Sequence, residues 1–476
     1  MRLDEWSGSD RVSDLTVPGT LDRLIDFYGA QQPDVVRAVF AKAWRLGARS
    51  ALIERRYIDA DYRDEHSKFY STTFRRYPSV AHRVHFFADA PPAALSDPDV
   101  PYDFQGLTYL GYTVLRPVPG APVGRTVLRV PDRWVKQVTC TVEETVNVFG
   151  VDLRVKGTPF MAQDAQLSRC AHTTTWVAAY INHRRFAGPR VLPGAIADAV
   201  VAAGGLGRSV PSPGLTMAQM SETCRAVRLP PLVYPLQNLA KGETIPRVLC
   251  RYLNSGIPVI VVGRGHAFVV VGYGRERNAL GEEALYFVRQ DDEVGPYERI
   301  DHWALDPYSP WQYAIVPLPQ KVYLAGEDAE TIGVGRLRNA LQATLDHDAK
   351  TLLSRWEARD VTVRSSVVPS NEFKRDLARR GMPPGLRAVY SRLPMSRYVW
   401  VVELQDRRLR DQGKPSVLAE AVVDATDHPR DPHALAWRVP GLITAWFPDE
   451  DRIAVRREPG AAPLWSAGRQ DETEGP

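Results

Sequence analysis

Apolar residues recur at helical spacing in several stretches of the chain. In Asp34–Leu46 they return every three or four positions, so that they fall on one side of a helix. A second stretch, Ser168–His183, carries Trp176 and Tyr180 at the same spacing. Further helices are predicted at about residues 217–227, 245–254 and 336–359.

Short runs rich in β-branched and aromatic residues predict strands in three parts of the chain. Pro-rich breaks such as Pro117–Pro122 separate the first group. Helices and strands therefore mix along the whole chain, which predicts an α+β fold. The predicted strands cover residues 50–58, 82–87, 109–115, 125–130, 258–262, 267–273, 285–290, 398–404 and 417–423, with a further extended run at 311–324.

The length of the chain, 476 residues, predicts two to four domains at roughly 100–200 residues each. The pattern divides into an N-terminal domain over 1–150, a central domain over 151–326 and a C-terminal domain over 333–457. Gly326–Ile332 is charged and contains glycine, so we expect a linker there. Residues 458–476 have the composition of a disordered tail.

Composition excludes several classes of protein. Apolar residues make up 44% and charged residues 24%, which excludes a mostly disordered chain and a coiled-coil rod. The net charge of +4 is spread along the chain, without the concentrated basic stripe of a nucleic-acid binder. The longest apolar runs are far shorter than the roughly 20 residues that cross a bilayer. We therefore expect no nucleic-acid partner and no membrane span.

Cysteine usage and the first residues indicate a reducing compartment. Cys140, Cys170, Cys224 and Cys250 form no CxxC pair and no Cys/His cluster with zinc spacing. The first ten residues are polar and lack the apolar core of a signal peptide. The expected location is the cytoplasm, with export by a route that needs no N-terminal signal left open.

Two other polar groups invite a metal interpretation. The acidic run Asp59–Glu65 lacks the glycine and the terminal glutamate of a calcium loop, so a solvated turn is expected. His82 and His85 flank a predicted strand without a third ligand. The sequence therefore predicts no metal and no cofactor.

Cys170 lies at the predicted start of a helix, with Ser168 as the expected N-cap. A thiol in the first turn faces unpaired backbone N–H groups and the positive end of the helix dipole, which lower its pKa. The alternative is a packing role, because free cysteines are among the most buried residues. We expect that role for the other three cysteines. His172, two positions further along the helix, is expected to point away from the thiol and to be a structural or surface residue rather than the base.

His266 and two acidic residues lie at the ends of neighbouring predicted strands. His266 begins an apolar strand directly after Gly265, at a place where catalytic groups are often displayed. Asp291 and Asp292 end the next strand. In an antiparallel pair, one of these carboxylates would orient the imidazole. The alternatives are a core histidine and acidic residues that only form a turn.

The order of these pieces resembles that of papain-like cysteine peptidases, and most closely the bacterial double-glycine (bacteriocin-leader) peptidases. The resemblance covers about residues 155–320. The run His266–Tyr273 matches the family's His-strand-Gly-Tyr pattern. Counting five from Tyr286 along the third strand, as the family pattern does, selects Asp291 over Asp292.

The resemblance also implies a glutamine before the nucleophile, whose amide helps to form the oxyanion hole. Gln163 lies seven positions before Cys170 and Gln166 lies four. Because the family spacing is about six, Gln163 fits better. Two departures concern substrate binding rather than the triad. Ala171 stands where the family often has a glycine directly after the nucleophile. The tryptophan that lies next to the cysteine in papain itself is displaced here to Trp176.

The resemblance implies a papain-like core, in which the nucleophile helix packs on an antiparallel sheet, flanked by two additional α+β units. It assigns Cys170 as nucleophile, His266 as base, Asp291 as the orienting carboxylate and Gln163 as oxyanion donor. The expected activity is hydrolysis of a peptide or isopeptide bond of a protein substrate through a thioester.

Two other activities and the roles of the flanking units stay open at this point. The alternatives to a peptidase are a glutamine deamidase or transglutaminase-like acyl transferase on the same fold, and a non-catalytic papain-like binding module. The N-terminal unit is expected to regulate the core, and the C-terminal unit to recognise the substrate or a regulatory protein partner.

Overall fold

The computed structural model has a mixed α+β architecture, as the pattern predicted. All strand pairs among the described residues are antiparallel. Among the described residues, no helix combines the length and the apolar composition that spanning a bilayer requires. The described residues are 11–29, 31–90, 106–163, 170–203, 215–263, 265–277, 283–305, 311–380, 382, 384–412, 414–447 and 452–457.

The chain forms two compact units. The first consists of Met1–Arg247 and Gly256–Pro319, and the second of Val248–Ser255 and Gln320–Pro476. Most of helix α7 (Ile245–Leu253) therefore belongs to the second unit, although it lies in sequence between elements of the first.

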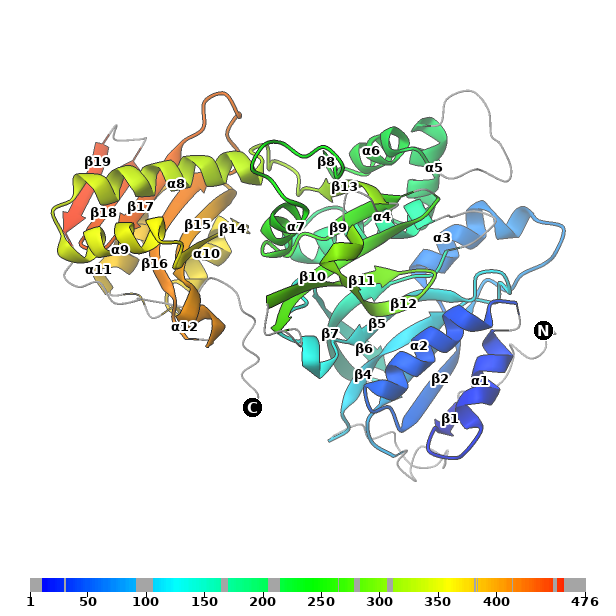
Figure 1. The fold of residues 1–476 in the computed structure, drawn as a ribbon. Coiled ribbons are helices and arrows are strands. Elements are labelled where there is room, and N and C mark those ends of the chain that lie inside the picture. The colour runs from blue at the N-terminus through cyan, green and yellow to red at the C-terminus, as the bar shows by residue number, and fades with distance from the viewer. Residues whose placement is uncertain are drawn as a thin grey trace. The chain divides into compact units, whose positions relative to one another are not determined.

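A seven-stranded sheet organises the N-terminal part of the first unit (Figure 1). In β6, Val142, Val146 and Val148 are buried while Glu143 and Asn147 are exposed, which is the period of two expected of a strand with one buried face. The strands, in sheet order, are β1 (Arg11–Asp14), β2 (Ser50–Tyr57), β3 (Ala81–Phe87), β4 (Tyr109–Leu115), β5 (Val123–Arg129), β7 (Val151–Phe160) and β6 (Val142–Val148).

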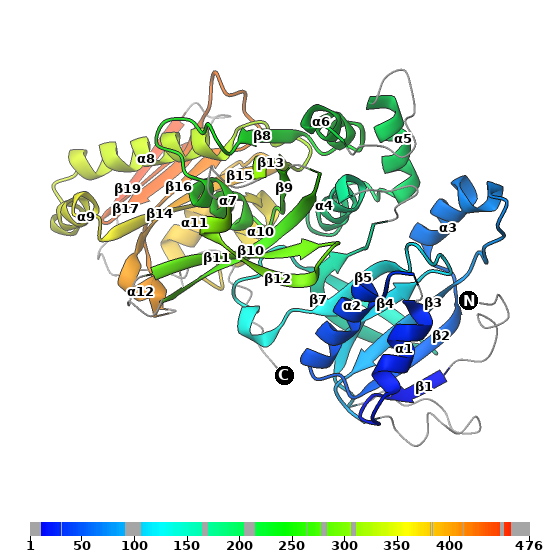
Figure 2. The ribbon, with the colours of Figure 1, turned by 45° about the vertical axis from the view of Figure 1, so that its right-hand side comes forward.

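Two helices, α1 (Thr20–Tyr28) and α2 (Pro33–Arg45), lie over one face of this sheet, as Figures 1 and 2 show. The sequence predicted α2 from its apolar spacing. Phe40 of α2 meets Phe86 of β3 edge-on, with the ring centroids 5.4 Å apart. Most of the predicted apolar side of the helix therefore packs on the sheet, although Trp44 near its end is 45% exposed.

A six-stranded sheet carries the rest of the first unit, and α4 (Cys170–Phe186) packs against its strand β10. Helices α5 (Pro193–Ala203) and α6 (Met217–Ala226) pack against α4. The strands, in sheet order, are β12 (Gly295–Asp301), β11 (Glu283–Asp291), β10 (Ala267–Arg277), β9 (Val259–Gly263), β13 (Trp311–Pro317) and β8 (Pro231–Pro235).

The two sheets of the first unit are joined by buried hydrogen bonds at Tyr297 of β12. Its hydroxyl donates to the carbonyl of Leu128 in β5 at 2.7 Å and accepts from the N–H of Thr158 in β7 at 2.6 Å. The predicted domain boundary between 150 and 151 falls in the turn between β6 and β7, and the whole of β6 pairs with the first seven residues of β7. The structure therefore places the predicted N-terminal and central domains in one compact unit.

The second unit is a six-stranded antiparallel sheet with helices on both faces. One apolar core lies between the sheet and α8 and α9, and another between the sheet and α10 and α11. The strands, in sheet order, are β14 (Val361–Pro369), β15 (Tyr398–Asp406), β16 (Val417–Asp424), β17 (Ala434–Val439), β18 (Leu442–Phe447) and β19 (Arg452–Arg457). The helices are α8 (Gly326–Ala343), α9 (His347–Glu357), α10 (Ser370–Asp376), α11 (Pro384–Arg392) and α12 (Arg407–Asp411).

The prediction of a linker at residues 326–332 was wrong, because these residues form the first turns of α8. Its glycine is required by packing. A Cβ on Gly326 would lie 2.4 Å from the side chain of Arg251 and 2.9 Å from that of Trp400. The long helix predicted at 336–359 is divided into α8 and α9. Asp346 caps α9 by accepting hydrogen bonds from two backbone N–H groups, at 3.0 and 3.1 Å.

Candidate active site

A tight turn between β9 and β10 presents His266 at the end of the second sheet. The N–H of Gly263 donates to the carbonyl of His266 at 3.0 Å, which closes the turn. Gly265 has a φ of +81°, a left-handed conformation that favours glycine. The glycine that the sequence places before His266 is therefore needed for the backbone to turn at this point.

The pairing of β10 with β11 brings His266 to Asp291. Val269 lies opposite Gln290 in the ladder, so the residues just before β10 face those at the end of β11. Nε2 of His266 lies 2.9 Å from Oδ1 of Asp291. The structure thus brings together the two residues that the sequence paired as base and orienting carboxylate.

Asp291 is buried and surrounded by groups that stabilise its charged form. Its Oδ2 forms an ion pair of 2.7 Å with Nη1 of Arg289, and its Oδ1 accepts from the N–H of Glu293 at 3.1 Å. Burial by itself raises the pKa of the Asp291 carboxyl, but the hydrogen bond to His266 and the charge of Arg289 outweigh it, so the pKa is lowered. A carboxylate at this place stays ionised and can hold an imidazolium.

The other ring nitrogen of His266 faces two further acidic side chains. Its Nδ1 lies 3.3 Å from Oε1 of Glu293, which is half exposed, and 4.0 Å from Oδ1 of Asp292, which is buried. Burial raises the pKa of Asp292 to about 7. The charge of His266 lowers this pKa, whereas the negative charges of Asp291 and Glu293 raise it further. Asp291 and Asp292, which the sequence treated as alternatives, therefore occupy different positions around the same ring.

The N-terminal turn of α4 lies next to this acidic pair. Cys170 is the first residue of α4, as the sequence predicted, and Ser168 lies outside the described residues. Thr173, one turn further on, is buried and donates from Oγ1 to Oδ2 of Asp292 at 3.4 Å. The helix start that carries Cys170 is thereby joined to the strand end that carries Asp291.

The two candidate oxyanion glutamines lie on the segment that connects β7 to α4. Gln163 follows β7 by three residues, and its side chain is half buried. Gln166 lies outside the described residues. The assignment of Gln163 to the oxyanion hole stays a prediction.

Aromatic residues that the sequence did not single out enclose His266. The ring of Trp311, at the start of β13, lies 6.0 Å from the imidazole, centroid to centroid. Trp311 packs edge-on against Phe268 at 4.7 Å, and the guanidinium of Arg289 lies over the Phe268 ring at 4.8 Å. Trp311 comes from a distant strand, and only the pairing of β13 with β9 brings it here.

The acidic run Asp59–Glu65 was wrongly expected to be a solvated turn. Asp59 caps α3 (Ala60–Lys68), and three of its acidic side chains are buried. They form ion pairs with arginines from distant segments. The pairs are Asp59 with Arg125 at 2.7 Å, Glu65 with Arg116 at 2.8 Å, and Asp61 with Arg190.

The remaining candidates have structural surroundings. Cys140 and Cys224 are buried, and burial raises the pKa of each thiol to about 12, which suits the packing role expected of them. Cys250 is partly buried. His82 lies 2.9 Å from the hydroxyl of Tyr28, and His85 lies within hydrogen-bond distance of Tyr109 and Glu54.

Donor atoms of His266, Asp291 and Asp292 lie within 4.8 Å of one another, a spacing that a metal site would also have. Asp291 already binds His266 and the cationic Arg289. A guanidinium in contact with a ligand carboxylate opposes a second cation at the same place. The geometry therefore favours a hydrogen-bonded histidine–carboxylate pair over a metal site.

No model of a protein family matches the chain, and no curated protein matches it.

Proposed function

We propose that this chain is a cysteine peptidase with a papain-like core, which hydrolyses a peptide or isopeptide bond of a protein substrate. The observation that carries the proposal is the contact of 2.9 Å between Nε2 of His266 and Oδ1 of Asp291. A buried carboxylate on one ring nitrogen fixes the tautomer, so the other nitrogen, Nδ1, exchanges a proton with the nucleophile.

The position of Cys170 supports its assignment as that nucleophile. It begins α4, where backbone N–H groups and the helix dipole stabilise a thiolate. The same helical turn is joined to Asp292 through Thr173, and Asp292 follows the carboxylate that orients His266. The packing of α4 on an antiparallel sheet also suits a papain-like core.

The proposed reaction proceeds through a thioester. His266 takes the proton of Cys170, and the thiolate sulfur attacks the carbonyl carbon of the substrate. The C–N bond then breaks, and His266 gives the proton to the leaving amine. Water then attacks the thioester and loses a proton to His266. The C–S bond breaks, the acid leaves, and His266 returns the proton to the sulfur of Cys170. Gln163 and the backbone N–H of Cys170 are the proposed donors to the oxyanion.

Thiol labelling tests this assignment directly. Iodoacetamide at neutral pH should alkylate Cys170 faster than the other cysteines, because a thiol in the first turn of a helix has a lowered pKa. Cys170→Ala should abolish both fast labelling and peptide cleavage, and His266→Ala should slow cleavage by roughly 10²–10⁴-fold. Alkylation sites and rates are read by mass spectrometry.

Cys224→Ala is the matched control, since the Cys224 thiol is buried and its pKa is raised to about 12. This variant should keep fast labelling and cleavage. Fast labelling that persists in Cys170→Ala would contradict the assignment. A mixed-protein digest followed by mass spectrometry separates chain cleavage from deamidation, which changes the mass of a glutamine without cutting the chain.

A further inference from the structure

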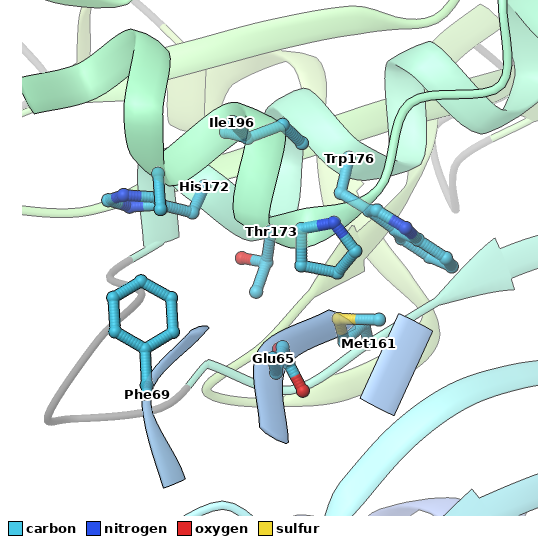
Figure 3. A pocket seen from close by; sticks show the side chains of 9 residues that line it. Glu65, Phe69, Met161, His172, Thr173, Trp176 and Ile196 are labelled. Carbon is cyan, nitrogen blue, oxygen red and sulfur yellow. The ribbon is translucent and has the colours of Figure 1, made fainter. Parts of the chain in front are cut away.

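A carboxylate beside the start of α4 is neutralised inside the protein. Figure 3 shows an apolar pocket between α3 and the first turns of α4, with Glu65 and Met161 on one side of the space and Thr173 and Ile196 on the other. Both carboxylate oxygens of Glu65 accept from Nη1 of Arg116, at 3.0 and 2.8 Å. The negative charge of Glu65 is therefore already paired.

The two aspartates at the end of β11 are buried. Asp291 forms an ion pair of 2.7 Å with Arg289 and lies 2.9 Å from His266. Asp292 accepts at 3.4 Å from Thr173, which also lines the apolar pocket. Because both aspartate side chains are almost fully buried, neither carboxylate is open to a substrate.

Glu293 differs from these carboxylates because solvent reaches it. It follows Asp292 in the turn between β11 and β12, and its side chain is 54% exposed. Its Oε1 lies 3.3 Å from Nδ1 of His266. In the part of the chain that the structure describes, no other basic side chain lies within 4 Å of its carboxylate. An accessible negative charge therefore lies next to the proposed base.

The contact with Nδ1 places Glu293 close to the leaving half of the substrate. In the proposed reaction, Nδ1 of His266 gives its proton to the amine of the breaking C–N bond. Proton transfer requires the two nitrogens to lie within about 3 Å of each other. Because the Glu293 carboxylate lies 3.3 Å from the same Nδ1, it would lie within roughly 6–7 Å of the leaving amine. The long stem of a lysine or arginine spans such a distance.

We propose that Glu293 selects substrates whose leaving half carries a lysine or arginine within two residues of the cleaved bond. The inference rests on the proposed function. The cationic side chain would pair with the exposed carboxylate, which then has a partner other than Nδ1 of His266. Nδ1 can then take the proton of Cys170 and give it to the leaving amine. An acidic side chain at the same place would be repelled.

Matched peptides test the proposal. The bond that is cleaved fastest in the mixed-protein digest is placed in synthetic peptides with lysine, norleucine or glutamate at the first or second position after it. Norleucine keeps the four-carbon chain of lysine without the charge, so the comparison isolates the charge. With the full chain, kcat/KM should be roughly 3–10-fold higher for lysine than for norleucine at one of the two positions, and lowest for glutamate.

Glu293→Gln and Glu276→Gln form a matched pair of variants. Glu276 lies near the far end of β10, its side chain is 48% exposed, and it pairs with Arg299 at 2.5 Å. Glu293→Gln should bring the lysine-to-norleucine ratio close to 1. Glu276→Gln removes the same charge and should keep the ratio of the parent chain. Glu293→Lys should reverse the preference in favour of glutamate.

Charged thiol reagents test the position of Glu293 without a peptide. Methanethiosulfonates with an aminoethyl, methyl or sulfonatoethyl group each form a mixed disulfide with Cys170 and release methanesulfinate. Glu293→Gln should lower the ratio of the cationic to the anionic rate roughly 3–10-fold, and Glu276→Gln should leave it unchanged. Mass spectrometry of the full chain measures the rates at Cys170, with the neutral methyl reagent as the reference.

The two proposals fail in different ways. Fast iodoacetamide labelling of Cys170 without a lysine preference, or a preference that Glu293→Gln retains, would overturn the role of Glu293 alone. A reagent ratio that Glu293→Gln leaves unchanged would do the same. A Cys170 that iodoacetamide labels no faster than the other cysteines, or a digest without chain cleavage, would overturn the proposed function and the role of Glu293 with it.

Discussion

Asp291 and Asp292 are neighbours in sequence, yet their surroundings move their pKa values in opposite directions. Asp291 meets His266 and Arg289 and has a lowered pKa, whereas Asp292 is buried with little compensation and has a pKa of about 7. Two carboxyl groups whose pKa values are driven apart around one histidine are typical of sites that move protons. The difference supports giving Asp291 the orienting role.

At pH 8, Asp292→Asn and Asp291→Asn should change the free energy of unfolding in opposite directions. Unfolded Asp292 ionises near 3.8 and folded Asp292 near 7, so the folded state loses stability as pH rises through that window. Asp292→Asn removes the loss and should be more stable than the parent chain at pH 8, by on the order of 1 kcal/mol or more. The two proteins should be nearly equal in stability at pH 4. Urea unfolding at both pH values measures this.

Asp291→Asn is the control for that experiment. The lowered pKa of Asp291 contributes stability above the unfolded value of 3.8, which is lost only as pH falls through the folded pKa. This variant should therefore be less stable than the parent chain at pH 8. Equal effects of the two substitutions at pH 8 would show that the two surroundings do not differ as the structure indicates.

At the scale of elements, α3 shows how a polar stretch can form part of a core. The sequence DADYRDE has no apolar stripe, but three of its acidic residues are buried because arginines from β5, from the residue after β4 and from the segment after α4 reach them. Asp61 accepts from the indole of Trp176 as well as from Arg190. The helix thus holds one wall of the apolar pocket against α4.

Asp61→Ala should destabilise the first unit strongly. It would leave the charge of Arg190 and the Trp176 indole without their buried partner, which costs about 3–5 kcal/mol. Asp34→Ala is the matched control. Its side chain is 89% exposed and lies 3.6 Å from Arg37, so the expected cost is roughly 0–1 kcal/mol.

Chemical denaturation of both variants measures the two costs. Similar losses in Asp61→Ala and Asp34→Ala would contradict the buried ion-pair network of α3.

At the scale of the whole molecule, the compact units do not follow the predicted domain boundaries. β7 belongs to the first sheet, where it pairs with β5 and β6, and it leads directly toward α4. Lys42 of α2 also bonds the carbonyl of Tyr297 and the carboxylate of Glu298, each at 2.8 Å. A predicted peptidase core that begins at 151 is therefore not separable from the elements before it.

A chain of residues 151–326 should consequently fail to fold by itself. β7 would lose both of its partner strands and expose unpaired backbone and apolar side chains, which favours aggregation. Solubility and circular dichroism measure the outcome against the full chain. A soluble 151–326 chain with a cooperative melt would show that β5 and β6 are dispensable.

The amount of fold that could be predicted differs between residues. Strong periodicity was sufficient for α2, and Tyr109–Leu115 was predicted with the bounds that β4 has. Predictions failed where long-range partners decide the structure. Gly326 suggested a linker, because its close packing against Arg251 cannot be recognised in the neighbouring sequence. The acidic residues around α3 were expected to be solvated, because the arginines that pair with them are distant in sequence.

For the candidate site, the sequence by itself determined residue types and order: a cysteine at a helix start, a histidine after a glycine, and an acidic pair at a strand end. These are local features, set by backbone preferences and spacing. The resemblance favoured Asp291 over Asp292, but only the tertiary structure shows which of them bonds Nε2 of His266, because strand register fixes which side chain meets the ring. It also decided the pocket and Trp311, because both depend on packing between segments that the sequence separates widely.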